Sequence, residues 1–142
     1  MLRLKQVADE LGLPLGERTM TYNSRLAQEL AKWAESRGKG DEFHDAVFRA
    51  YFVDGKNIGK VDVLADLAKS IGFSDEEART VLKSRSFRKG VDSDWSLAHE
   101  MGITSVPTFV INRQAVVGAQ PYEVLEKFLR DNHVKKRAGS NV

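Results

Sequence analysis

Apolar residues recur every three or four positions through the first hundred residues of the chain. This period places apolar side chains on one face of a helix, so the pattern predicts a series of amphipathic helices. Trp33 and Trp95 fall on two of these stripes and are expected in the core. The six apolar stripes are Leu4–Leu11, Leu26–Ala34, Phe43–Tyr51, Leu64–Ile71, Ala78–Leu82 and Phe87–Ala98.

Polar residues and glycines mark where these helices start and stop. Ser74-Asp75-Glu76-Glu77 has the pattern of a capping box, in which a serine and a glutamate three residues later satisfy each other's free N–H groups. Asn23 or Ser24 is expected to cap the second helix. Gly72 and Gly102 supply the left-handed residue that commonly ends a helix.

The period of the pattern changes toward the C-terminal end. The runs Thr108–Ile111 and Ala115–Val117 are short, apolar and separated by Asn112-Arg113-Gln114, which predicts a β-hairpin. Pro121 suits the first turn of a helix, and apolar positions from Val124 to Leu129 predict a final helix. Because a lone hairpin exposes two unpaired edges, we expect its first strand to be covered by the chain's own helices, a second copy, or strands of another polypeptide.

A chain of 142 residues, 42% of them hydrophobic, is long enough for one ordinary domain with a packed core. Its formal net charge is +2, and Lys135, Lys136 and Arg137 supply three positive charges close to the C-terminus. The rest of the chain is therefore almost neutral, and no nucleic-acid partner is expected. We interpret the three basic residues as part of a solvated tail.

The chain contains no cysteine. Structural disulfides, thiolate metal sites and thiol redox catalysis are therefore excluded for these residues. His44, His99 and His133 lie far apart in the sequence and match no metal-binding pattern. No metal, cofactor or catalytic residue is expected within this chain.

The sequence shows no apolar segment of the kind that inserts into a bilayer. No stretch approaches the roughly 20 apolar residues that a spanning helix needs, and the start of the chain has no apolar leader region. We therefore expect no membrane partner and a cytoplasmic location.

Several segments resemble the DsbA-like thioredoxin-fold family, close to its FrnE-like branch. The most specific are Gly102–Ile111 and Gly118-Ala119-Gln120-Pro121, because their spacing fits a strand entered by a proline, a hairpin and a closing helix. The other matching segments are Asn23–Ala27, Phe43–Phe52 and Asn57–Gly59. The resemblance implies an α+β, mostly helical fold that consists of a helical insertion subdomain plus the C-terminal β-hairpin and helix of a thioredoxin fold.

The resemblance covers nearly the whole chain but only the C-terminal two-thirds of the family domain. Family members begin with a strand, a Cys-x-x-Cys at a helix start and a second strand, and this sequence is expected to begin after them. The implied organisation is a helical subdomain over residues 1–101, the C-terminal part of the thioredoxin fold over 102–131 and a basic tail over 132–142.

The resemblance also implies a substrate-binding loop at Ser105, Val106, Pro107 and Thr108. Proline has no N–H and is tolerated at the start of a strand, where a cis X-Pro bond costs only about 0.5–1 kcal/mol. In the family the backbone beside the residue that matches Val106 pairs with an extended peptide or thiol substrate, which is a form of strand addition. A peptide or thiol ligand is therefore expected at this cis-proline loop.

Three functions follow from these features. The first is a truncated DsbA-like thiol–disulfide oxidoreductase, redox-inactive in this form because exchange needs a thiolate. The second is a non-catalytic binding or assembly module that uses the edge of the cis-proline strand. The third is a truncated relative of the glutathione-dependent 2-hydroxychromene-2-carboxylate isomerases.

The missing strands also predict an assembly. Without them the cis-proline strand exposes apolar side chains and unpaired N–H and C=O groups. We therefore expect a homodimer that forms through the exposed hairpin edge and the final helix. The competing outcome is that the N-terminal helix, Arg3–Leu11, folds over the hairpin within one chain.

Overall fold

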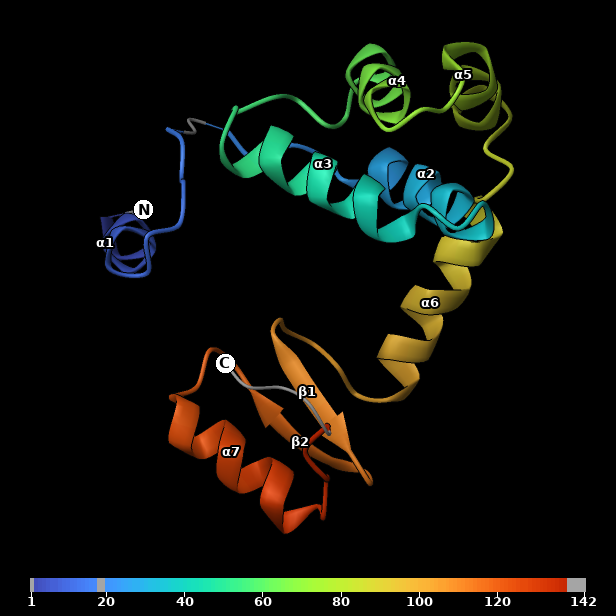
Figure 1. Cartoon of the computed structure of the whole chain (residues 1–142). Helices are drawn as coiled ribbons and strands as arrows, with labels where there is room; N and C mark the ends of the chain where they lie inside the picture. The colour runs from blue at the N-terminus through green and yellow to red at the C-terminus, as the bar shows by residue number, and fades with distance from the viewer. Residues whose placement is uncertain (1, 18–19, 138–142) are drawn as a thin grey trace. The chain divides into compact units, whose positions relative to one another are not determined.

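The computed structural model describes residues 2–17 and 20–137. The chain forms two compact units, Met1–Asp94 and Trp95–Val142, and the sixth helix runs across the division between them (Figure 1). The elements in chain order are α1 (Leu2–Glu10), α2 (Arg25–Ser36), α3 (Gly40–Phe52), α4 (Val61–Ser70), α5 (Asp75–Ser84), α6 (Arg88–Glu100), β1 (Thr108–Ile111), β2 (Gln114–Val117) and α7 (Tyr122–Asp131).

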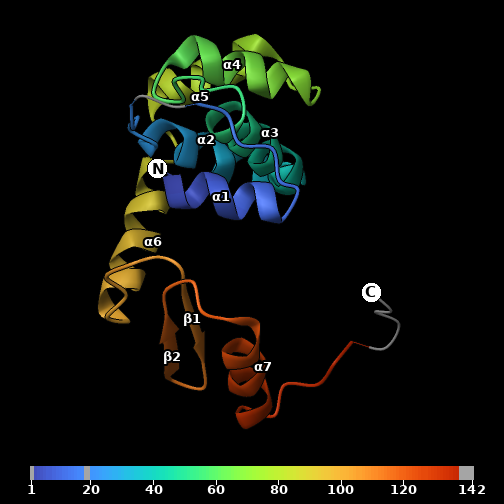
Figure 2. The same ribbon diagram turned by 90° about the vertical axis from the view of Figure 1, so that its left-hand side faces the viewer.

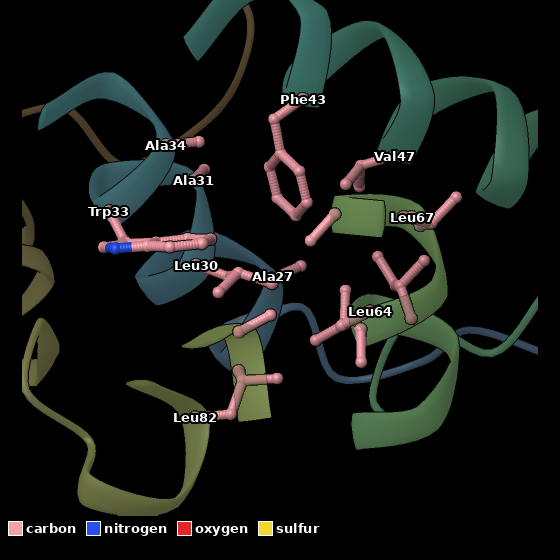
Figure 3. Packing of buried hydrophobic residues seen from close by; sticks show 14 of the residues in the cluster. Ala27, Leu30, Ala31, Trp33, Ala34, Phe43, Val47, Leu64, Leu67 and Leu82 are labelled. Carbon is pink, nitrogen blue, oxygen red and sulfur yellow. The ribbon is translucent and has the colours of Figure 1, made fainter. Parts of the chain in front are cut away.

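The first unit is built around the apolar faces of α2, α3, α4 and α5, which pack against one another. Leu30, Phe43 and Leu64 are completely buried, and Figure 3 shows their side chains among the alanines of α2 and the leucines of α4 and α5. The Trp33 ring packs on the Phe73 ring with 4.3 Å between their centroids. The helices predicted from the apolar period are therefore confirmed, and four of them, α2 to α5, make one core.

Side chains accept free N–H groups at two of the predicted helix starts. The Arg25 N–H donates to Oδ1 of Asn23 at 2.8 Å, although the N-cap residue of α2 is Ser24, whose own side chain accepts no capping bond. The Glu77 N–H donates to Oγ of Ser74 at 3.4 Å, which is the serine half of the predicted capping box.

The expected burial of the two tryptophans is correct for one and wrong for the other. Trp33 is 3% exposed, whereas Trp95 is 54% exposed. Val91 is the only buried residue of α6, so the apolar stripe of this helix leaves the first core after one turn. Periodicity identified the apolar face of α6 but not the point at which that face stops being covered.

The second unit contains the hairpin and α7, which lies alongside it in both views (Figures 1 and 2). Strands β1 and β2 are antiparallel, and their link is Asn112-Arg113, one residue shorter than expected, because Gln114 already pairs with Ile111. Asn132, the residue that follows α7, donates through Nδ2 to Oε1 of Gln114 at 3.1 Å. Phe128 of α7 is buried, so this helix covers one face of the two-stranded sheet.

The fold class expected from the sequence is confirmed, because the described residues are mostly helical and carry one small antiparallel sheet. The limits of the helical subdomain at residue 101 and of the thioredoxin part at residue 131 stay predictions. Lys135, Lys136 and Arg137 of the expected basic tail are exposed, and residues 138–142 of that tail lie outside the described residues. None of the helices described is both long and apolar enough to span a membrane.

Candidate functional site

The candidate site is the segment that joins α6 to β1. The way in which α6 ends determines the direction in which this segment leaves the helix. Gly102 has φ of 71°, which is the left-handed region that glycine adopts without a steric penalty. The Gly102 N–H donates to the His99 carbonyl at 2.9 Å, and the Ile103 N–H donates to the Ala98 carbonyl at 2.9 Å. These two bonds form a Schellman motif, so the chain leaves α6 in a fixed direction toward the loop.

The four residues expected to bind substrate form a short turn at the entry to β1. The Val106–Pro107 peptide bond is cis. The Thr108 hydroxyl donates to the Ser105 carbonyl at 2.7 Å, and the Gly118 N–H donates to the Pro107 carbonyl at 2.8 Å. The loop is thus tied to the strand that follows it and to the end of β2.

This loop presents Val106 outward and opens beside a hollow. Val106 is 89% exposed, the most exposed large apolar side chain described. Ser105 and Thr108 lie in the wall of a hollow of about 230 Å³, which Ile103, Val110 and Arg113 also line. The loop therefore combines a protruding apolar side chain, an accessible backbone and an adjacent cavity large enough for one side chain. Such an arrangement suits an extended peptide better than a buried small molecule.

The loop and the hollow offer hydroxyl, guanidinium and backbone groups as contacts for a ligand. The whole chain lacks cysteine, and Ser105 has no histidine or carboxylate among the residues that line the hollow with it. In the part of the chain that the structure describes, no three His, Asp or Glu side chains gather as metal ligands. His44 is an exposed residue of α3 whose ring lies 6.2 Å from that of Phe48.

Sequence reasoning missed a buried carboxylate in the first unit. Glu29 of α2 is 1% exposed. Its carboxylate accepts from Nε and Nη2 of Arg85, both at 2.7 Å, and from Nε of Arg25 at 2.8 Å. Hydrogen bonds from Arg85, and then from Arg25, lower the pKa of Glu29 from 4.5 to about 2, although burial alone would raise it.

This Glu29 cluster joins parts of the chain that are distant in sequence. Arg25 also donates to the Arg88 carbonyl at 3.1 Å and to Asp92, both on α6. The cluster therefore holds α2 to the α5–α6 turn and fixes where α6 starts. The i,i+4 spacing of Arg25 and Glu29 was visible in the sequence, but the partner Arg85 was not.

A second feature that the sequence did not reveal is an aromatic groove between α2 and α3. It has a volume of about 510 Å³, and its apolar wall includes Tyr22, Phe48, Tyr51 and Phe52. The Tyr22 and Tyr51 rings lie 6.4 Å apart, and the Phe48 and Phe52 rings lie 6.2 Å apart. Phe48 and Phe52 are four residues apart on α3, which was the available signal for an apolar strip beside the core.

Comparison with known proteins gives a consistent result. A family model described as DSBA-like thioredoxin domain matches residues 1–130 of this chain. The uncharacterized protein YwbO of Bacillus subtilis (strain 168) is 30% identical over 136 residues, which are 94% of this chain and 68% of YwbO. The ClpXP adapter protein SpxH of the same strain is 30% identical over 115 residues, which are 76% of this chain and 38% of SpxH.

Solved structures share the fold. The probable DsbA oxidoreductase SCO1869 from Streptomyces coelicolor superposes with a TM-score of 0.83 at 28% identity, over 99% of this chain and 62% of that one. The cytosolic disulfide reductase DsbM from Pseudomonas aeruginosa, solved with GSH, superposes with a TM-score of 0.64 at 23% identity, over 92% of this chain and 75% of DsbM. The chain thus spans about two thirds of the length of YwbO and of SCO1869. On the family match and the shared fold, this chain belongs to the DSBA-like thioredoxin domain family.

Proposed function

We propose that this chain is the substrate-holding part of a DsbA-like thiol–disulfide oxidoreductase and that these 142 residues bind an extended peptide or thiol without exchanging disulfides. The observation that carries the proposal is the cis-proline loop, which exposes Val106 beside a hollow in a chain that has no cysteine. Disulfide exchange requires a thiolate that attacks a sulfur atom, and this chain supplies none.

In this function the backbone beside Val106 pairs with the peptide, and the hollow lined by Ser105 and Thr108 receives one of its side chains. Main-chain pairing supplies affinity, and the hollow supplies selectivity. The Thr108 hydroxyl holds the Ser105 carbonyl at 2.7 Å and so fixes the shape of the loop. Because no disulfide is possible within this chain, its folding does not need an oxidising compartment, and a cytoplasmic location is part of the proposal.

Similarity to SpxH favours the related interpretation of a binding module without redox chemistry. That protein is a ClpXP adapter, and the similarity covers 76% of this chain. An adapter binds other proteins rather than transforming them, so both interpretations expect peptide binding without turnover. They differ in whether a cysteine-containing peptide is preferred over the same peptide with serine in place of cysteine.

Two measurements test the proposal. Insulin reduction in the presence of a dithiol should proceed at the rate of the buffer control, whereas a DsbA-like protein with an intact Cys-x-x-Cys should accelerate it. Any turnover by this chain contradicts the proposal. Titration with an extended cysteine peptide should then shift the amide NMR signals of Ser105, Val106 and Thr108, and titration with the serine version should separate the two interpretations.

A matched pair of variants locates the binding. Thr108→Val removes the hydroxyl that holds the Ser105 carbonyl, and we expect peptide affinity to fall about threefold to tenfold, because such a bond contributes about 1 kcal/mol. Thr80→Val makes the same change at an exposed position of α5 and should leave the affinity unchanged. Saturable binding of glutathione, followed by Trp fluorescence, in the absence of peptide binding would instead favour a relative of the glutathione-dependent isomerases.

A further inference from the structure

Arg113 brings a positive charge to the hollow beside the cis-proline loop. It is the one charged residue among the described residues that line this hollow of about 230 Å³. The rest of the wall includes the hydroxyl groups of Thr104, Ser105 and Thr108 and apolar side chains such as that of Met101. A ligand group that enters the hollow therefore meets one cation in surroundings that are otherwise uncharged.

No carboxylate within residues 2–17 and 20–137 neutralises this charge. The ion pairs among these residues join other side chains. On α7, for example, Glu126 pairs with Arg130 at 2.9 Å. The guanidinium of Arg113 is thus available to a group from outside the chain. A guanidinium suits a carboxylate, because its planar fork donates two parallel hydrogen bonds to the two oxygens.

The hairpin turn holds Arg113 in a position that its backbone disfavours. Asn112 and Arg113 have φ of 49° and 66°, and the second position of such a two-residue turn favours glycine. The turn is also anchored, because Nδ2 of Asn112 donates to Oδ1 of Asn132 at 3.3 Å. Strained residues concentrate at sites that hold ligands, so an arginine in this position is consistent with binding.

We propose that the hollow receives a glutamate side chain of the peptide and that Arg113 binds its carboxylate. This inference rests on the proposed function, because it names the side chain that the hollow selects from the peptide held beside Val106. The methylene groups of a glutamate can lie along the apolar wall, and its charge matches that of one guanidinium. A phosphate group fits less well, because it brings about two negative charges to a hollow with one cation.

The affinities of matched peptides test the proposal. Each peptide contains a cysteine, is blocked at both ends, and has glutamate or glutamine directly before or directly after the cysteine. Blocked ends make the glutamate side chain the only carboxylate of the peptide. By titration calorimetry, the glutamate peptide of at least one matched pair should bind about threefold to tenfold more tightly than its glutamine partner. Raising the ionic strength from about 0.01 M to about 0.15 M should reduce this ratio.

Variants of Arg113 assign the preference to its guanidinium. Arg113→Gln should bind the glutamate and glutamine peptides equally, with its affinity for the glutamine peptide unchanged. Arg130→Gln removes the same charge from an exposed position of α7 outside the hollow, so it should keep the preference. Arg113→Glu should reverse the preference, so that a lysine peptide binds more tightly than the glutamate peptide.

Arg113→Gly separates binding from folding. Glycine adopts positive φ without a steric penalty, so this variant should be at least as stable to urea as the unmodified chain and yet should not prefer glutamate. If Arg113→Gly keeps the preference, the guanidinium does not hold the carboxylate and the proposal is wrong.

The results distinguish this inference from the proposed function on which it rests. Equal binding of the glutamate and glutamine peptides by the unmodified chain overturns the glutamate preference but leaves peptide binding at the loop in place. A preference that persists in Arg113→Gln also overturns it, because another group then binds the carboxylate. If no peptide of either kind binds, the proposed function fails and the glutamate preference fails with it.

Discussion

At the scale of single residues, Glu29 shows how a charged side chain is accommodated in a core. Removing a carboxylate from water costs several kcal/mol unless hydrogen bonds and opposite charges replace the lost hydration. Arg85 and Arg25 together supply that replacement, and Arg85 adopts φ of 54° at the end of α5. Arg85 is therefore both the left-handed residue at the end of α5 and the residue that joins α2 to the α5–α6 turn.

Glu29→Gln should destabilise the chain by about 3 kcal/mol at neutral pH, because it leaves two arginines without their shared carboxylate. The lowered pKa predicts how this difference depends on pH. A carboxylate whose pKa falls from 4.5 to about 2 on folding contributes stability above pH 4.5 and loses it as the pH falls toward 2. Urea unfolding followed by circular dichroism should therefore show the two stability curves converging at acid pH.

The control for this prediction lies on the same helix. Glu35 of α2 is exposed, so Glu35→Gln should change the free energy of unfolding by less than about 0.5 kcal/mol at any pH. Equal effects of Glu29→Gln and Glu35→Gln, or a stability difference that persists unchanged at low pH, would show that the Glu29 cluster does not stabilise the fold.

At the scale of elements, the hairpin turn is suboptimal in one position. Asn112 and Arg113 have φ of 49° and 66°, so both residues of the two-residue turn are left-handed. This is the pattern of a type I′ turn, which favours Asn at the first position and Gly at the second. Arginine at the second position holds a conformation that costs an ordinary residue about 1–2 kcal/mol.

Arg113→Gly should therefore stabilise the hairpin by about 1 kcal/mol. Hydrogen exchange at the Phe109 and Ile111 amides, which face β2, should slow by about threefold to tenfold. Arg113→Ala removes the same side chain but keeps Cβ, so it should give no such protection. Equal slowing in both variants would mean that loss of the arginine side chain, rather than relief of the turn, is responsible.

The elements themselves were largely predictable, and the reasons are local. Leu30, Phe43 and Leu64 lie on apolar stripes that a helix in water has to bury. Ser74 and Asn23 mark helix starts, because their side-chain oxygens accept free backbone N–H groups there. The hairpin followed from a change of period, and only its turn length was wrong. Each of these features depends on residues a few positions apart.

At the scale of the molecule, the features that the sequence did not reveal all depend on distant pairs. The charge of Glu29 is buried because of Arg85, which follows it by 56 residues. The aromatic groove brings Tyr22, which precedes α2, to 6.4 Å from Tyr51 of α3. Trp95 is 54% exposed although it lies on the apolar stripe of α6, because the period of a stripe does not specify which of its positions other elements cover.

The two units should differ in stability, because they differ in the number of apolar side chains that they bury. The first contains a cluster that includes Leu30, Phe43 and Leu64, whereas Phe128 is the one buried apolar residue among the described positions after 94. Native-state hydrogen exchange at low micromolar concentration should therefore show the Phe109 and Ile111 amides exchanging at least about tenfold faster than those of Leu30 and Leu64, a difference of about 1.4 kcal/mol in opening free energy. Equal protection of the four amides would instead mean that both units unfold together as one cooperative structure.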